Sequence, residues 1–354
     1  SRAKAAGLKI LSTIILRQRF GSLDFPEKDS IYHNYQETTA AMNAIAAGAP
    51  DLVSLFPIGK SVQGREILAL RLTRGASGTS PSKKPGIVFL GSHHAREHLS
   101  TVGPLLLAKY LVDNRLQPEV ARQLESRDIY FIPMVNPDGA EFDIEDGRYH
   151  MHRKNMTTNG DGTLGVDLNR NYSWGWGGGG ASPNPGDDTY RGTKAFSEPE
   201  TKAVKAFVEA RPNLKILLSY HTFSELILYP WGGSNEQIPD AKALTAFKTM
   251  AGEMAKMTGY TPEQSSDLYI ATGDTCDWAW GEKGIFAFTF ELTPKSMWDG
   301  GFYPGAGVVT RVFQANIRPA LYLIDLSDDP LRASAGTGVF AAAPASKSQG
   351  EATK

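Results

Sequence analysis

Cysteine and an excess of charge are the two things that this chain most clearly lacks. Cys276 is its only cysteine, so no intramolecular disulfide can form, which is compatible with both the cytosol and bacterial secretion. Lys and Arg number 37 against 38 Asp and Glu, giving a net charge of -1. Such a chain has no strong field of one sign, so we expect neither nucleic acid nor an anionic membrane as a partner.

Long hydrophobic runs are missing as well. The nearest candidate, Leu8–Leu16 (LKILSTIIL), is too short to span a bilayer. Basic residues flank it as they do in a signal peptide, but no small-residue cleavage site follows it. The pattern therefore favours a pro-segment or a core element over a signal sequence.

Nucleotide-binding patterns are also absent. No GxGxxG or P-loop motif follows an expected strand, and Gly177–Gly180 belongs to a long surface loop. Hydrophobic residues make up 41% of the chain, as in packed globular proteins, and residues 24–332 have a uniform globular texture. Residues 333–354 are mostly Ala, Ser, Gly and Lys, so we interpret them as a disordered tail or a linker.

Expected strands alternate with expected helices along the globular part. Continuous or alternating apolar runs predict strands over 66–73, 86–91, 128–135, 214–219 and 285–292. Helical spacing predicts helices over 38–47, 99–112, 197–210, 241–257 and 308–324, with Ser197 and Glu200 as a capping box. A turn is expected at 136–139 (NPDG). The alternation predicts a single α/β/α domain, with a mixed, mostly parallel twisted sheet covered by helices on both faces.

Three histidines gather just past one buried strand, in GSHHAREHLS. Ligands collect outside the carboxyl ends of strands in open α/β sheets. His94 and Glu97 are three residues apart and can face one point. Catalytic zinc commonly takes two His and one Glu, and His221, which follows another buried strand, is the best candidate for the third ligand.

Two other interpretations of this segment stay open on the residues alone. It can be a polar surface turn without a metal. It also matches the pattern H-x-x-E-H, in which His94 and His98 would both bind zinc and Glu97 would be the base. That pattern requires the whole motif to lie inside a helix, whereas here it starts at a strand end.

Four separated segments together resemble the zinc metallocarboxypeptidases of the carboxypeptidase A/B family, and most of all the bacterial type known as carboxypeptidase T. The resemblance covers residues 24–326 in order and spacing. The segments are HHAREH (93–98), HRKN (152–155) with VDLNRNY (166–172), SYHTFSELILYPWGG (219–233), and SDLYIATGDTCDW (266–278) with FAFTFEL (286–292).

The resemblance implies a role for each residue of the reacting centre. His94, Glu97 and His221 would bind one Zn2+ per chain, and Asp167 would orient His94. Glu291 would be the general base, taking a proton from water and passing it to the leaving amine. Other divalent metals are the alternative to zinc, because affinity alone does not select it.

The resemblance also implies how a peptide is held. Arg153 would stabilise the oxyanion, a contribution of roughly 3 kcal/mol. Asn169 and Arg170 would grip the terminal carboxylate, which a guanidinium fork suits. Tyr269 would close over the substrate and Arg96 would serve the neighbouring subsite. The alternatives are a packed loop aromatic for Tyr269 and a surface ion pair for Arg96.

Some positions depart from the family pattern. Phe223 stands where the family often has Tyr, so one subsite hydrogen bond is in doubt. His98 replaces the Trp of animal enzymes, and His150 replaces an arginine. The stretch Gly75–Lys84, which corresponds to an acidic calcium loop in some bacterial relatives, has no carboxylate. A calcium site is not expected there and stays open elsewhere, for example around Glu37.

The pocket for the terminal side chain is expected to be mostly small and apolar. Its predicted lining is Leu228, Gly232, Ala271, Asp274, Cys276 and Thr289. Cys276 occupies the position that is apolar in A-type enzymes and Asp in B-type enzymes, which argues against a strict basic preference. Asp274 could pair with a substrate Lys or Arg, or could simply cap a loop. We therefore expect dual preference for hydrophobic and basic C-terminal residues.

The sequence as a whole predicts a secreted bacterial exopeptidase that acts as a monomer on peptide and protein C-termini. Residues 1–23 would be the end of an activation segment, with maturation near Asp24 and a zymogen precursor. Two other functions remain: a peptidoglycan-peptide hydrolase or small-molecule deacylase of the same fold, and a non-catalytic binding module. The intact His94, Glu97, His221 and Glu291 argue against the last.

Overall fold

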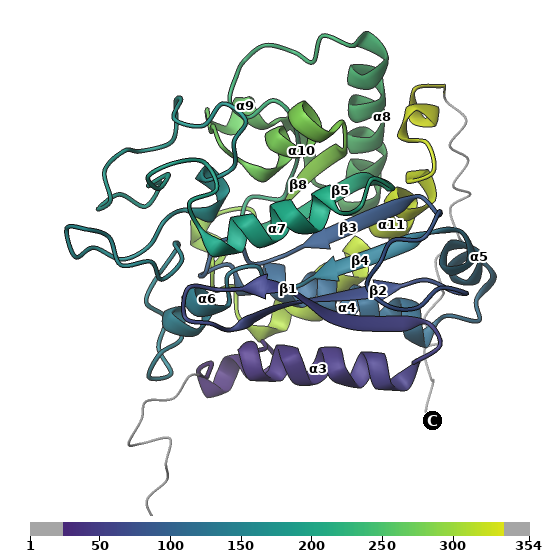
Figure 1. Cartoon of the computed structure of the whole chain (residues 1–354), viewed down its shortest axis with the longest axis horizontal. Coiled ribbons are helices and arrows are strands. Elements are labelled where there is room, and N and C mark those ends of the chain that lie inside the picture. Colours follow the sequence, from purple (N-terminus) through teal and green to yellow (C-terminus); the bar gives the residue numbers. More distant parts are fainter. Residues whose placement is uncertain (1–23, 336–354) are drawn as a thin grey trace, which may run out of the picture.

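The computed structural model describes residues 24–335, which form one eight-stranded sheet with helices on both faces (Figure 1). The strands are β1 (Val53–Lys60), β2 (Glu66–Leu72), β3 (Gly86–Leu90), β4 (Asp128–Ile132), β5 (Leu214–Thr222), β6 (Leu226–Tyr229), β7 (Thr261–Gln264) and β8 (Phe286–Leu292). The predicted activation segment and the tail from residue 336 onward lie outside the described residues.

The sheet is mixed, with a parallel centre flanked by antiparallel pairings and a parallel β6–β7 pair at one edge. Its order is β1-β2-β4-β3-β5-β8-β6-β7. Strands β4, β3, β5 and β8 run parallel to one another, whereas β1 with β2, β2 with β4, and β6 with β8 are antiparallel. The buried central strands are the apolar runs that were predicted from the sequence, as is typical of parallel strands covered on both faces. The predicted fold class is confirmed.

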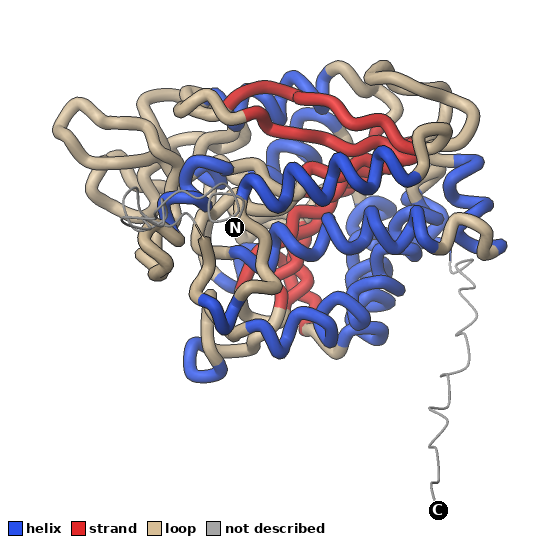
Figure 2. Tube along the Cα trace, turned by 90° about the horizontal axis from the view of Figure 1, so that it is seen from below, coloured by secondary structure: helices blue, strands red, loops and turns tan. Residues whose placement is uncertain are grey.

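Helices cover both faces of the sheet. The helices are α3 (Tyr35–Gly48), α4 (His98–Asp113), α5 (Pro118–Ser126), α6 (Pro137–Asp143), α7 (Pro199–Glu209), α8 (Ala241–Thr258), α9 (Ser265–Leu268), α10 (Thr275–Lys283) and α11 (Val309–Leu326), with short 3-10 turns at 27–29, 168–170, 297–299, 306–308 and 330–335. One hydrophobic cluster joins α3, α4, α8 and α11 to the sheet, and a second joins α7 and α10 to its other face. Figure 2, in which the molecule is seen from below, shows helices lying in front of the strands. Among the described residues no helix combines the length and apolarity needed to cross a bilayer.

Two local predictions were wrong. Ser197 and Glu200 form no capping box: α7 begins at Pro199, and the Glu200 carboxylate instead accepts hydrogen bonds from Val62 N (3.0 Å) and Asn155 Nδ2 (3.0 Å). A capping box does exist at Asn34 and Glu37, where it opens α3. The tertiary contacts of Glu200 thus take the place of the capping box expected from the sequence at α7.

The predicted turn at 136–139 is the first turn of a helix. Asn136 is the N-cap of α6, and its side chain accepts from Gly139 N at 3.1 Å. Pro137 occupies the first helical position, where its missing N–H costs nothing. The motif was predicted to be a turn that closes the preceding strand, and in the structure it starts a helix.

Two features of the fold position the candidate site. The carboxyl ends of β3, β5 and β8 meet at one edge of the sheet, and the chain between α6 and α7 forms long loops that gather on the left in Figure 1. Gly91 directly follows β3, and a Cβ there would lie 2.1 Å from Ser100 O, so only glycine lets α4 pack this closely.

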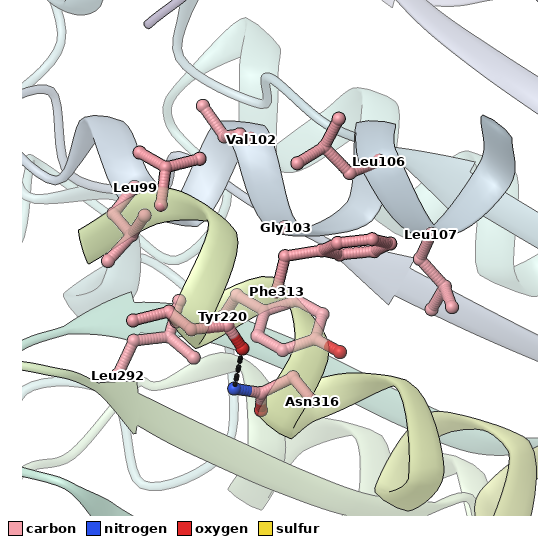
Figure 3. A pocket seen from close by; sticks show the side chains of 11 residues that line it. Leu99, Val102, Gly103, Leu106, Leu107, Tyr220, Leu292, Phe313 and Asn316 are labelled. Carbon is pink, nitrogen blue, oxygen red and sulfur yellow. Dashed lines mark hydrogen bonds between the residues drawn. The ribbon is translucent and has the colours of Figure 1, made fainter. Parts of the chain in front are cut away.

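An apolar cavity lies between α4 and α11, directly behind that edge (Figure 3). Leu99, Tyr220 and Leu292 line it, and each stands one or two positions from a candidate site residue. Gly103 also lines it, and a methyl group added there would meet only Tyr220 Cγ, at 4.0 Å. The site is therefore backed by a core that is not completely filled.

Candidate active site

Three buried side chains converge where β3 and β5 end. His94 Nδ1 lies 2.7 Å from Glu97 Oε1 and 3.1 Å from His221 Nδ1, and His221 Nδ1 lies 2.9 Å from Glu97 Oε2. Within residues 24–335 they are the one group of three or more His, Cys, Asp or Glu residues placed to hold a metal ion. Donors bound to one tetrahedral zinc at about 2.0–2.1 Å lie roughly 3.3 Å apart, so this spacing fits the group.

The contacts of the two Nε2 atoms orient the imidazole rings of His94 and His221. His94 Nε2–H donates to Asp167 Oδ1 (3.2 Å), and His221 Nε2 lies 3.1 Å from Ser219 Oγ. The Asp167 carboxylate only accepts, so the His94 Nδ1 lone pair points inward, and His221 Nδ1 faces the same point, as metal ligands require. Burial, and after it the nearby Arg153, lowers the pKa of His94, which keeps this imidazole neutral. The residues present suit a zinc ion of the two-histidine, one-glutamate type.

His98 does not take part in this group, so the alternative with His94 and His98 as joint ligands does not hold. His98 is the first residue of α4, and its Nε2 lies 2.8 Å from Asp143 Oδ2. The hydroxyl of Tyr303 donates to the same carboxylate. His98 thus belongs to a separate buried network.

Asp167 connects the triad of His94, Glu97 and His221 to an arginine, Arg153. It is fully buried, and its Oδ2 accepts from Arg153 Nε at 2.9 Å while Oδ1 accepts from His94 and from Asn169 N. Burial alone would raise the pKa of Asp167, but Arg153 and His94 hold it well below its usual range. A charged Asp167 therefore orients both side chains.

Glu291 lies directly across the sheet from the third ligand. In the parallel pairing of β5 with β8 it stands opposite His221. Burial, with Glu97 as the next contributor, raises its pKa to about 8. A carboxyl group whose pKa is raised toward neutral pH can both give and take a proton there, which suits a role in proton transfer.

An open, cationic pocket adjoins the triad. Its lining includes Arg96, Arg153, Arg170 and Tyr269, all of which the sequence singled out. The Arg170 guanidinium donates to Gly180 O (2.9 Å) and Asn169 O (2.7 Å) and lies 5.8 Å from the centre of the half-exposed Tyr269 ring. Such a pocket suits an anionic group of a ligand.

The side-chain amide oxygen of Asn169, Oδ1, accepts hydrogen bonds from Thr275 N (3.0 Å) and Thr275 Oγ1 (2.8 Å). Its amide NH2 is thereby left as the donor that a ligand can meet. Arg96 pairs with the exposed Asp188 (3.2 Å), donates to Met151 O and stacks on Phe302 at 4.3 Å. Its surface ion pair and its place in the pocket therefore coexist.

The residues predicted to line the side-chain pocket also come together. Leu228 and Thr289 are cross-strand partners, and Cys276 Sγ lies 3.2 Å from Thr289 Oγ1. Asp274 is the N-cap of α10, where its Oδ1 accepts from Cys276 N and Asp277 N, and its Oδ2 faces Gly232. Asp274 is thus a helix cap whose second carboxylate oxygen is buried beside these residues.

Three residues of the site were not assigned from the sequence. Ser219 precedes His221 by two positions on β5, which puts both on one face and could have revealed it. His93 was noted without a role; its ring stacks on His221 at 5.7 Å and contacts Tyr172 OH. Asp277 is buried beside Asp274, and no local pattern marks it.

Comparisons with known proteins match most of the chain. A sequence profile described as zinc carboxypeptidase matches residues 38–318. A zinc carboxypeptidase of Saccharothrix mutabilis subsp. capreolus is 37% identical over 317 residues, 87% of this chain and 72% of that protein. Bovine carboxypeptidase A1 is 34% identical over 266 residues, 74% of this chain and 62% of its own length. The chain thus spans less than two thirds of the bovine relative.

Solved structures agree with the fold. Bovine thrombin-activatable fibrinolysis inhibitor, in complex with a tick carboxypeptidase inhibitor, superposes with a TM-score of 0.73 at 26% identity, covering 84% of this chain and 97% of that one. Carboxypeptidase A from Helicoverpa armigera gives a TM-score of 0.72 at 27% identity, covering 86% and 74%.

Proposed function

This chain belongs to the zinc carboxypeptidase family, and from that premise we propose that it releases single residues from the C-termini of peptides and proteins, with dual preference for hydrophobic and basic residues. The observation that carries the proposal is the cationic pocket of Arg96, Arg153 and Arg170, which adjoins the His94, Glu97 and His221 group. An enzyme with such a pocket beside its reacting centre selects a substrate that ends in a carboxylate.

The residues divide the work between binding and proton transfer. Arg170 and Asn169 hold the terminal carboxylate, and Tyr269 covers it from the exposed side. His94, Glu97 and His221 would hold a zinc ion, which would supply Lewis acidity toward the scissile carbonyl and toward water.

Proton transfer falls to Glu291, which accepts a proton from the attacking water and returns it to the leaving amine. Arg153, oriented by Asp167, faces the oxygen on which negative charge develops. The dual preference follows from the apolar wall of Leu228 and Cys276 with one carboxyl, Asp274, set into it.

A direct test uses two linear peptides that differ only in a C-terminal Phe or Arg, incubated with the full chain and followed by mass spectrometry. We expect stepwise loss of single C-terminal residues, abolished by a zinc chelator and restored by zinc. Glu291→Gln is the control, because it should bind zinc without cleaving. Cleavage of neither peptide by zinc-loaded protein, with cleavage of muropeptides or acylated small molecules instead, would favour the alternative activity.

The setting of this activity is part of the same proposal. We propose a secreted monomer that matures near Asp24 from a zymogen. N-terminal sequencing of active material from culture medium, with size-exclusion chromatography, tests these points. Active protein that keeps Ser1 would contradict the maturation step, and active protein found only inside cells would contradict secretion.

A further inference from the structure

A second buried carboxyl, Asp277, lies beside Gly232, one of the residues predicted to line the side-chain pocket. Asp277 is 1% exposed, and its oxygens accept from Gly232 N (2.9 and 3.1 Å) and Gly233 N (2.8 Å). These bonds hold the loop after β6 against the start of α10. A Cβ on Gly232 would lie 3.4 Å from Asp274 Oδ2, so the same loop also meets the neighbouring carboxyl.

The four oxygens of Asp274 and Asp277 are not equally satisfied. Both oxygens of Asp277 accept backbone N–H groups, and Asp274 Oδ1 accepts from Cys276 N (2.9 Å) and Asp277 N (3.0 Å). Asp274 Oδ2 is buried and has no hydrogen-bond partner, and no other carboxylate oxygen within residues 24–335 is in this condition. A buried acceptor of this kind needs either a proton of its own or a donor from a ligand.

We propose that Asp274 and Asp277 share one proton, carried on Asp274 Oδ2 while the pocket is empty, and that this pair sets the choice between basic and apolar C-terminal residues. The inference rests on the proposed function. A Lys or Arg side chain brings the donor that Oδ2 lacks and displaces the proton to solvent. An apolar side chain leaves the proton in place. Asp277 acts through Asp274 and is a positioning residue.

The surrounding groups are consistent with one shared proton. Arg170 and Tyr172 face the pair from the segment around 168–172, Cys276 faces it from α10, and Glu236 lies with Asp277 in the groove beyond β6. Burial raises the pKa of Asp274 although Arg170 opposes it, and burial together with the Asp274 carboxyl raises the pKa of Asp277 well above its usual range.

Substrate binding changes this balance in one direction. Arg170 is the cation among these groups, and the terminal carboxylate of a bound peptide neutralises it. The pair then holds its proton more strongly, unless the terminal side chain is itself cationic. The two classes of substrate therefore respond oppositely to pH.

The test compares two peptides that end in Lys or in norleucine, which differ only in the terminal ammonium. The kcat/KM values are measured on the zinc-loaded full chain between about pH 5 and about pH 9, where Lys stays charged. Their ratio cancels every step common to both peptides, including ionisation of Glu291. We expect the Lys-to-norleucine ratio to rise with pH, by up to about tenfold per unit, and then to level off.

Variants locate the proton. In Asp277→Asn the neighbouring negative charge is gone, so Asp274 ionises more readily and the rise moves to lower pH by about one unit or more. In Asp274→Asn the ratio is low and independent of pH. The matched control is Asp51→Asn, an exposed residue outside the pocket, which should follow the unmodified chain.

A flat ratio in the unmodified chain overturns the inference, and so does an unmoved midpoint in a folded Asp277→Asn. Because the first of these needs no variant, a failure of Asp277→Asn to fold does not rescue the idea. Absence of cleavage of both peptides refutes the proposed function instead, so the two failures are distinguishable.

Discussion

Replacing Asp167 by Asn tests whether one buried carboxylate organises the reacting centre. Asp167 accepts from His94 Nε2, Arg153 Nε and Asn169 N through its two oxygens. Asn has one acceptor oxygen in the same shape, so its NH2 must face either His94 or Arg153, donor against donor. The imidazole loses the partner that fixes its inward lone pair, or the arginine loses its counter-ion.

The structure sets the size of the effect. Loss of a carboxylate that orients a metal-bound histidine typically costs about 10–100-fold in metal affinity or activity, equivalent to roughly 1.4–2.8 kcal/mol. Leaving Arg153 buried without its partner destabilises the fold by about 3–5 kcal/mol. We therefore expect Asp167→Asn to weaken zinc binding and lower kcat/KM by at least tenfold, with a clear loss of unfolding free energy.

Chelator competition measures zinc affinity, peptide hydrolysis measures kcat/KM, and urea denaturation measures stability. Asp128→Asn is the matched control, because Asp128 also pairs with a buried arginine, Arg71 at 2.9 Å, but at the opposite end of the strands. It should lose stability without losing zinc affinity. The reasoning is refuted if Asp167→Asn binds zinc as the unmodified chain does, or if Asp128→Asn weakens zinc binding equally.

Three further predictions concern the base, the cavity and pH. Glu291→Gln should lower kcat by about 10²–10⁴ with unchanged zinc content by elemental analysis, and normal turnover would dismiss the base role. Gly103→Ala, which adds a methyl group toward the cavity in Figure 3, should stabilise α4 by about 1 kcal/mol in urea denaturation; a lower midpoint would contradict this. Burial raises the pKa of Glu200 from 4.5 to about 7, so its cost to stability is absent at low pH and grows as pH rises through this interval. The stability of Glu200→Gln relative to the unmodified chain should therefore increase by about 3 kcal/mol between about pH 4.5 and about pH 8, and parallel pH curves would exclude it.

The centre of the sheet could be predicted because its strands are buried on both faces. Strands β3, β5 and β8 are largely apolar runs of 5, 9 and 7 residues. Short apolar runs of this kind are typical of buried strands, whereas helices are usually longer. The edges could not be predicted. Strand β1 contains Pro57 and a register shift before Gly59, and β7 reads TPEQ, so only pairing with a neighbour makes either a strand.

The candidate site was predictable to the extent that residue type and spacing carry the chemistry. His94, Glu97 and His221 were found as strand-end ligands, and the resemblance supplied Arg153, Asp167 and Glu291. Partners that depend on the folded structure were missed. Ser219 and Asp277 act through contacts with residues brought close by the fold, and Glu200 was assigned to a cap that tertiary contacts had replaced.

Strand β8 carries both the wall of the side-chain pocket and the base, at Thr289 and Glu291, which face the same side two positions apart. Along an extended strand, two positions are separated by about 6.6–6.8 Å. In the proposed function, this spacing would set the cut one residue inward from the substrate's end. A one-residue slip in register would turn both side chains to the other face together, so on the proposed function the cutting position and the side-chain selection are coupled through one strand.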